Sequence, residues 1–258
     1  MKVHFVGAGP GAADLITVRG MRLLQNAGMI IYAGSLVNPE LLNYAPPGCE
    51  VRDSASMTLD EVINAIKDGH GRGLSVVRLH SGDPSLYGAV REQMDRLKAL
   101  GVPLEVVPGV SSFCAAAAAL NAEYTLPGVS QTLIITRMEG RTPVPERESV
   151  QKLAVHGASM ALFLSAGMLK ELCAALIEGG YRPETPAALV YKASWPEQKI
   201  LRGTLDNLPG QAEAANVRKT ALVLAGDFLE NEYELSKLYD ASFGHGFRDA
   251  RHFLGRGD

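Results

Sequence analysis

The chain has 258 residues, of which 47% are hydrophobic and 21% charged, a composition typical of globular proteins with one or two domains and unlike disordered or collagen-like chains. Its 25 basic and 28 acidic side chains give a net charge of −3, so no overall positive field attracts nucleic acid or an anionic membrane. We expect no nucleic-acid partner, no membrane span and no secretion signal.

The cysteines and histidines show no metal-binding pattern. Cys49, Cys114 and Cys173 lie far apart and form no CxxC pair, which argues against a disulfide framework and favours a reducing cytoplasm. The six histidines form no HxxH or HExxH spacing. The sequence therefore predicts no metal centre.

The first half of the chain alternates short apolar runs with amphipathic helical patterns. A strand at 3–8 leads through a glycine-rich turn to a helix at 18–27, and Thr58 with Glu61 forms a capping box. Further strands are expected at 29–34, 74–80 and 104–107, and further helices at 38–45, 58–69, 91–100 and 110–120. This alternation predicts an α/β domain over residues 1–122 with a mainly parallel sheet.

The second half begins a new series of elements. Strands are expected at 132–136, 159–165, 186–191, 199–203 and 220–226, and helices after the loop 137–149, at 168–180 and ending near Ala215. Because the strand at 199–203 follows the strand at 186–191 after a short loop, we expect an antiparallel hairpin in a mixed sheet. This predicts a second α/β domain, 123–258, with a peripheral tail after Asp227.

The segment GAGPGA at 7–12 matches the G-x-G-x-x-[GA] pattern of dinucleotide-binding turns. The next strand, however, ends in Ala33 and Gly34 rather than in an acidic residue that holds a ribose hydroxyl, and Pro10 removes one backbone N–H. Binding of a nicotinamide cofactor is therefore a minor alternative. A second alternative is that the glycine turn binds no ligand and only joins the strand to the helix.

The loop SGDPSLYG at 81–88 is the strongest site candidate, because it follows a strand whose carboxyl end is expected to border a ligand crevice. Asp83 can accept from a ligand hydroxyl or amine, and Tyr87 offers an aromatic face; alternatively, Asp83 only caps the following helix. The turn PGVSS at 108–112 follows the next strand. There, Ser111 either faces the same crevice or serves as a plain N-cap.

Two further features have both a packing and a ligand-binding interpretation. Trp195, the only tryptophan, lies in a turn and either packs or stacks on a flat ligand. Arg137, Arg141 and Arg147 either meet a polyanionic ligand or form a solvated surface, which is the more common case.

The order of these loops resembles that of the tetrapyrrole (corrin/porphyrin) methylase family. GAGPGAADLITVRG is similar to its N-terminal signature, LHSGDPSLYG to its central motif and VPGVSS to its next turn, and the resemblance extends from Lys2 to about Leu229. It implies two α/β domains with a cleft for S-adenosylmethionine and methyl transfer to a tetrapyrrole substrate. It also implies S-adenosylhomocysteine as the product, and a homodimer in the cytoplasm.

The segments at 32–42 and 190–198 are most similar to family members that methylate C11 of precorrin-4 or its cobalt complex in cobalamin biosynthesis, and the overall pattern favours the cobalt form. The resemblance assigns these residues to cofactor binding: Pro10, Ser81, Gly82, Asp83, Leu86, Tyr87, Ser111, Ser112, Ser165, Ala193, Thr220 and Ala221. It implies no catalytic residue, because relatives that methylate uroporphyrinogen carry an Asp where this chain has Ala33 or Gly34.

Three other functions stay open at this point. One is methylation at another corrin position or of diphthamide by the same fold. The second is an NAD-dependent oxidoreductase, against which the missing acidic strand end counts. The third is a non-enzymatic module that binds the cofactor without turnover.

Overall fold

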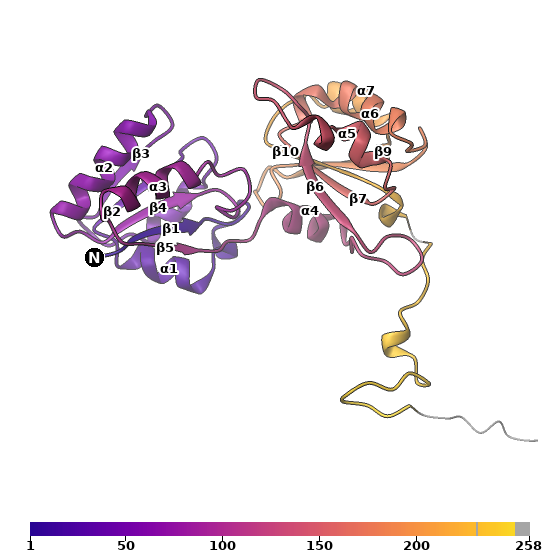
Figure 1. Cartoon of the computed structure of the whole chain (residues 1–258), viewed down its shortest axis with the longest axis horizontal. Coiled ribbons are helices and arrows are strands. Elements are labelled where there is room, and N and C mark those ends of the chain that lie inside the picture. The colour runs from indigo at the N-terminus through magenta and orange to yellow at the C-terminus, as the bar shows by residue number, and fades with distance from the viewer. Residues whose placement is uncertain (231, 251–258) are drawn as a thin grey trace, which may run out of the picture. The chain divides into compact units, whose positions relative to one another are not determined.

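The computed structural model describes residues 1–230 and 232–250 and confirms an α/β fold with two five-stranded sheets (Figure 1). Residue contacts divide the chain into two compact units. The first contains Met1–Asn121, Leu189–Leu201 and Val217–Leu222, and the second contains Ala122–Ala188, Arg202–Asn216 and the chain from Val223 onward. The domain boundary after residue 122 stays a prediction. The end of the predicted tail, 251–258, lies outside the described residues.

The first sheet has the strand order β3-β2-β4-β1-β5, and its neighbouring strands pair in parallel. Its strands are β1 (Val3–Gly7), β2 (Met29–Tyr32), β3 (Glu50–Asp53), β4 (Val76–His80) and β5 (Leu104–Val107). The central strands are apolar on both faces because helices cover both sides of a parallel sheet. The prediction of a mainly parallel first sheet is confirmed.

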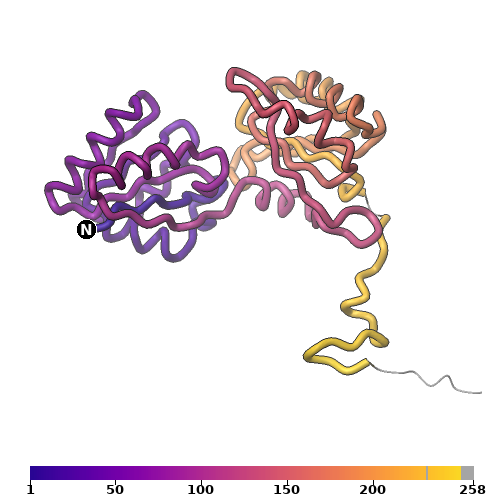
Figure 2. Tube along the Cα trace, viewed as in Figure 1, coloured from indigo at the N-terminus to yellow at the C-terminus, as the bar shows by residue number. Residues whose placement is uncertain are grey.

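Helices cover both faces of this sheet, and the chain path between them can be followed in Figure 2. They are α1 (Val18–Gln25), α2 (Leu59–Gly71) and α3 (Arg91–Ala99), with 3-10 segments η1 (Ala13–Leu15) and η2 (Pro39–Tyr44), and α4 (Ser112–Leu120) follows β5. Phe5 packs on the side of Ile66 and Leu97, which belong to α2 and α3. Val6, the next residue of β1, packs on the opposite side with Leu24 of α1.

The loops after β1 and β4 therefore leave the sheet at a topological switch point. These two strands are neighbours, but the chain continues from β1 into α1 on one face and from β4 into α3 on the other. Open α/β sheets bind their ligands beside the carboxyl ends of strands at such a point. This topology places GAGPGA and SGDPSLYG where a ligand is expected.

The second sheet has the order β6-β7-β10-β8-β9. Its strands are β6 (Leu133–Arg137), β7 (Ser159–Phe163), β8 (Pro186–Tyr191), β9 (Lys199–Thr204) and β10 (Ala221–Ala225). Its helices are α5 (Val150–Ala154), α6 (Leu169–Glu178) and α7 (Leu208–Ala214), with 3-10 segments η3 (Glu146–Glu148), η4 (Ala166–Met168), η5 (Asp227–Leu229) and η6 (Lys237–Tyr239). Strand β7 pairs in parallel with β6 and antiparallel with β10, so the prediction of a mixed sheet is confirmed. Strands β8 and β9 are neighbours, and their antiparallel direction stays a prediction.

Two local predictions were wrong. Strand β3 was not expected, because its sequence EVRD has no apolar run. It lies at the edge of the sheet, where half-buried and exposed positions alternate along it. Helix α2 does not stop at Gly69; it continues to Gly71, and the absence of a side chain at Gly69 lets the helix approach Met29 and Val76. The short helix expected at 38–45 is present as the 3-10 helix η2.

Among the described helices, none combines the length and apolarity needed to cross a bilayer.

Candidate functional site

The glycine turn after β1 is held by the loop between β8 and β9. The Trp195 Nε1 donates to the Pro10 carbonyl at 3.1 Å, and the Ala12 N–H donates to the Ser194 Oγ at 3.0 Å. A Cβ at Gly11 would overlap the Trp195 indole ring, so this position has no room for a side chain. The packing interpretation of Trp195 is therefore correct, and its partner is the glycine turn.

Three N–H groups of the same turn already donate to acceptors within the protein. Besides Ala12, the Ala8 N–H donates to the His80 carbonyl at 2.7 Å, and the Gly9 N–H donates to the Gly82 carbonyl at 3.2 Å. Because pyrophosphate binding depends on free N–H groups at such a turn, the geometry argues against the dinucleotide alternative. The glycines serve close packing of backbone and indole.

Asp83 joins the loops that follow β4 and β5. Its Oδ1 accepts from the Ser85 N–H at 2.8 Å, and its Oδ2 accepts from the Gly109 N–H at 2.8 Å. Burial alone would raise the pKa of this carboxyl, but the hydrogen bonds from Ser85 and Gly109 outweigh it and hold the pKa below the usual value. The carboxylate is thus ionised at neutral pH. Its Oδ2 keeps one acceptor position, because Gly109 is its only hydrogen-bond donor among the described residues.

Backbone strain gathers in the loops of this part of the first unit. Five non-glycine residues there have φ between 46° and 68°: Tyr87, Ala89, Lys192, Ser194 and Thr220. Such conformations cost about 1–3 kcal/mol each and persist where the surrounding structure enforces them, often at functional sites. The Lys192 N–H donates to the Thr220 carbonyl at 2.9 Å. This bond joins two of the predicted cofactor-binding segments, because Ala193 follows directly.

The predicted serines differ in how they are used. Ser111 is the N-cap residue of α4, as the packing interpretation expects, but it is only 6% exposed and its side chain makes no cap hydrogen bond, so its contact with a cofactor stays a prediction. Ser165, in the second unit, is fully buried; its Oγ accepts from the Met138 N–H at 2.9 Å and donates to the Phe163 carbonyl at 2.7 Å. Ser165 therefore fixes the loops after β6 and β7, and its contact with a cofactor stays a prediction.

The arginines of the loop after β6 have mixed roles. Arg137 donates from Nη1 to the carbonyls of Met138 and Thr142, each at 3.1 Å, and from Nη2 to the Pro143 carbonyl at 2.8 Å. It thus closes its own loop instead of presenting its guanidinium to a ligand. Arg147 lies 3.5 Å from Glu148 in an exposed ion pair, which fits the solvated interpretation.

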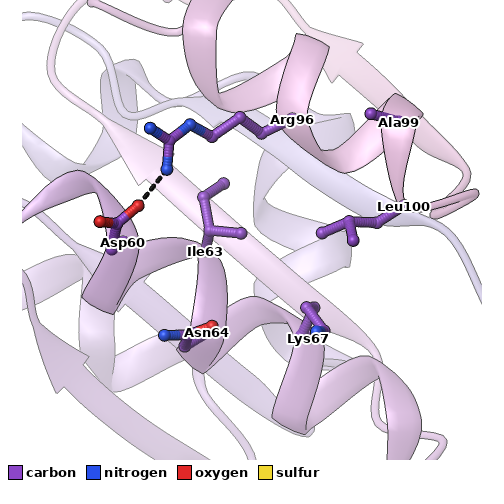
Figure 3. A pocket seen from close by; sticks show the side chains of 7 residues that line it. All are labelled: Asp60, Ile63, Asn64, Lys67, Arg96, Ala99 and Leu100. Atoms are coloured by element: carbon purple, nitrogen blue, oxygen red, sulfur yellow. Dashed lines mark hydrogen bonds and ion pairs between the residues drawn. The ribbon is translucent and has the colours of Figure 1, made fainter.

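A metal centre and a surface pocket are two other kinds of candidate site. Within residues 1–230 and 232–250, no group of three or more His, Cys, Asp or Glu side chains is arranged to hold a metal ion. A surface pocket of about 540 Å³ lies between α2 and α3, where Arg96 pairs with Asp60 (Figure 3). It is lined by helix residues and not by the loops at the switch point, so it is not part of the candidate site.

The chain is similar to known proteins over most of its length. Residues 2–209 match the family model of the tetrapyrrole (corrin/porphyrin) methylases. The chain belongs to this family. The methylase is 50% identical over 248 residues to the cobalt-precorrin-4 C(11)-methyltransferase of Methanocaldococcus jannaschii, with 96% of each chain covered.

Two solved structures resemble this methylase. One is the X-ray structure of a cobalt-precorrin-4 methyltransferase of cobalamin biosynthesis, with a TM-score of 0.87 and 48% identity over 89% of this chain and 96% of the other. The second is a uroporphyrin-III C-methyltransferase from Thermus thermophilus in complex with S-adenosylhomocysteine, with a TM-score of 0.72 and 27% identity over 89% and 99% of the two chains.

The sequence prediction of the site was incomplete for this methylase. It identified the loops after β1, β4 and β5, because glycines and prolines after apolar runs mark them. It missed Asn38, whose buried Nδ2 donates to the Gly11 carbonyl at 2.9 Å, and it assigned no partner to Trp195. A lone tryptophan beside a proline was the one available signal.

Proposed function

We propose that this methylase transfers a methyl group from S-adenosylmethionine to C11 of cobalt-precorrin-4 in cobalamin biosynthesis, with S-adenosylhomocysteine as the second product. The observation that carries the proposal is the 50% identity to the Methanocaldococcus jannaschii enzyme over 96% of both chains. The TM-score of 0.87 to a cobalt-precorrin-4 methyltransferase supports it.

The loops at the switch point fit such a cofactor. S-adenosylmethionine carries an ammonium and a sulfonium but no phosphate, so a glycine turn in which three N–H groups already donate to the protein is no obstacle. The ionised Asp83 keeps an acceptor position for a ligand amine or hydroxyl. The proposed cofactor residues are the set predicted from the resemblance, of which Asp83 has the most direct physical support.

The chain's own residues act mainly by positioning. The bound cofactor supplies the electrophilic methyl group. The hydrogen bonds that Trp195 and Ser194 make to the glycine turn, which we call the clasp, act together with the strained loops. They hold the site in one arrangement before any ligand binds. A fixed arrangement lowers the barrier of a displacement reaction by orienting its partners. No side chain is assigned as a base.

The first test of the site is the Asp83→Ala variant. It removes the remaining acceptor on Oδ2 and leaves the Gly109 N–H without its partner, so we expect the Kd for S-adenosylhomocysteine to rise about tenfold or more. Isothermal titration calorimetry measures this, with circular dichroism to confirm the fold. The matched control is Asp60→Ala on α2, outside the site, which should leave the Kd unchanged. An unchanged Kd in Asp83→Ala would remove this residue from the cofactor site.

The reaction itself is tested by anaerobic incubation with labelled S-adenosylmethionine and precorrin-4, with and without inserted cobalt. Mass spectrometry and positional NMR then locate the label. We expect transfer to C11 with the cobalt complex preferred. Preference for the metal-free substrate would overturn the cobalt assignment. Label at another carbon would overturn the C11 assignment while keeping the family, and cofactor binding without transfer to either substrate would point to a non-enzymatic role.

The proposal includes a homodimer that works in the cytoplasm. Both extend the resemblance to the family, and the three cysteines are free thiols in the structure, as is usual in a reducing compartment. Sedimentation equilibrium at micromolar concentration should give twice the 27.5 kDa chain mass. A single species at the chain mass would contradict the dimer.

A further inference from the structure

Arg78 is a buried cation in the strand that leads into the SGDPSLYG loop. It is 6% exposed, and it lies on the face of β4 that packs toward α2 and α3, opposite Phe5 in the strand register. Burial lowers the pKa of its guanidinium to about 10, which still leaves it charged at neutral pH. Within the described part of the chain it forms no ion pair with a carboxylate.

Its hydrogen bonds go to neutral groups. The Arg78 Nε donates to the Gln93 Oε1 at 3.2 Å, and Nη1 donates to the Ile31 carbonyl in β2 at 3.2 Å. Burying a charge without a counter-ion is costly. We therefore look for a role of the Arg78 guanidinium that an apolar side chain could not fill, and the hydrogen bonds of Gln93 indicate one.

Gln93 connects the buried cation to the strained part of the loop. It is 6% exposed in the first turn of α3, and its Nε2 donates to the Ala89 carbonyl at 3.0 Å. Ala89 has φ of 48° and Tyr87 has φ of 53°, both in the left-handed region that L-residues rarely adopt. A continuous chain of hydrogen bonds therefore runs from the end of β2 through Arg78 and Gln93 to this backbone.

We propose that Arg78 and Gln93 form a positioning pair that holds the backbone of Tyr87–Ala89 in its strained conformation and thereby sets the affinity for the methyl donor. Neither side chain touches the ligand; the pair acts through the loop that carries Asp83 and Tyr87. The part of this inference that concerns the ligand rests on the proposed function. The part that concerns the loop does not.

The Gln93→Glu variant separates the two hydrogen bonds of Gln93, the one it accepts from Arg78 and the one it donates to Ala89. A glutamate keeps an acceptor for Arg78 and adds a negative charge beside the buried cation, so the fold should be retained. It loses the Nε2 donor, and its carboxylate faces the Ala89 carbonyl with no proton to share. Gln93→Met removes both links and serves as a second variant. The matched control is Gln25→Glu, at the exposed end of α1.

The first readout uses the protein without ligand. Hydrogen exchange of peptides that cover Ser85–Val90 should speed up about fivefold to tenfold in both Gln93 variants, and not in the control. In Gln93→Glu the Tm should be no lower than in the wild type. The second readout is calorimetry with S-adenosylhomocysteine, in which the Kd should rise about fivefold to tenfold. In turnover, the KM for S-adenosylmethionine should rise more than kcat falls.

Each outcome decides one of the two questions. Unchanged exchange in the loop overturns the positioning pair, as does a lower Tm with no change in loop exchange, because that is the result of a merely structural role. Faster exchange with an unchanged Kd overturns its link to ligand affinity. If the wild type itself binds no S-adenosylhomocysteine, the proposed function fails, and the exchange experiment still decides whether the pair holds the loop.

Discussion

At the residue scale, the glycine turn depends on the absence of one side chain. A methyl group at Gly11 would overlap the Trp195 ring, whose Nε1 also donates to the neighbouring Pro10 carbonyl. Gly11→Ala must therefore push the indole away and lose this hydrogen bond. We expect the free energy of unfolding to fall by about 1–3 kcal/mol, together with weaker binding of S-adenosylhomocysteine. Urea denaturation and calorimetry measure the two effects.

The control for this substitution is Gly71→Ala at the end of α2, where a Cβ meets no atom within 4 Å. Its free energy of unfolding should stay within about 0.5 kcal/mol of the wild type. Equal behaviour of the two variants would show that the Trp195 ring yields easily and that the turn is not held by it.

At the element scale, predictions from local sequence were the most accurate. The capping box was expected from Thr58 and Glu61 alone, and the structure has both of its bonds: the Thr58 Oγ1 accepts from the Glu61 N–H at 3.3 Å, and the Glu61 Oε2 accepts from the Thr58 N–H at 2.6 Å. Thr58→Ala leaves the first turn of α2 without this partner. We expect a loss of about 1 kcal/mol in the free energy of unfolding, measured by urea denaturation.

A matched control for the capping box is Thr142→Ala, an exposed threonine in the loop after β6 whose side chain caps no helix. This variant should unfold at the wild-type urea concentration. If Thr58→Ala did the same, the interaction at the start of α2 would contribute nothing beyond what water supplies.

Other elements were missed because their cause is tertiary. Strand β3 exists because β2 offers it a partner, with Met29 opposite Glu50 and Tyr32 opposite Asp53, and its own sequence has no strand-like apolar run. Gly69 appeared to be a stop signal, but it is a position where a Cβ would crowd Met29 and Val76 of the sheet. In both cases the structure depends on a contact with another strand, which the local sequence pattern does not show.

At the scale of the whole molecule, the sequence indicated where the loops lie but not how they are joined. Alternating strands and helices predict a sheet whose carboxyl ends carry the ligand, and the strand order places the loops after β1 and β4 side by side. The clasp that holds the first of these loops joins Ala12 to Ser194 across 182 positions. No pattern in a single sequence shows a contact of that separation, because periodicity reports only local structure.

The stability of the molecule should fall in mild acid because of His80. This side chain is 5% exposed, its Nε2 has no hydrogen-bond partner among the described residues, and its ring stacks on Phe5 with 5.9 Å between centroids. Burial, with a smaller contribution from the charge of Arg78, lowers its pKa to about 3. In the unfolded chain the pKa of a histidine is about 6.5.

Between these two values the unfolded chain binds one more proton at this position than the folded protein does. The contribution of His80 to stability is therefore complete above pH of about 6.5 and is lost as the pH falls toward 3, with a slope of up to about 1.4 kcal/mol per pH unit. The His80→Phe variant keeps a ring against Phe5 but cannot bind a proton. Urea denaturation of both proteins from pH 7.5 to 5 should show the wild type losing stability more steeply. Parallel curves over the whole range would mean that His80 takes up its proton inside the fold.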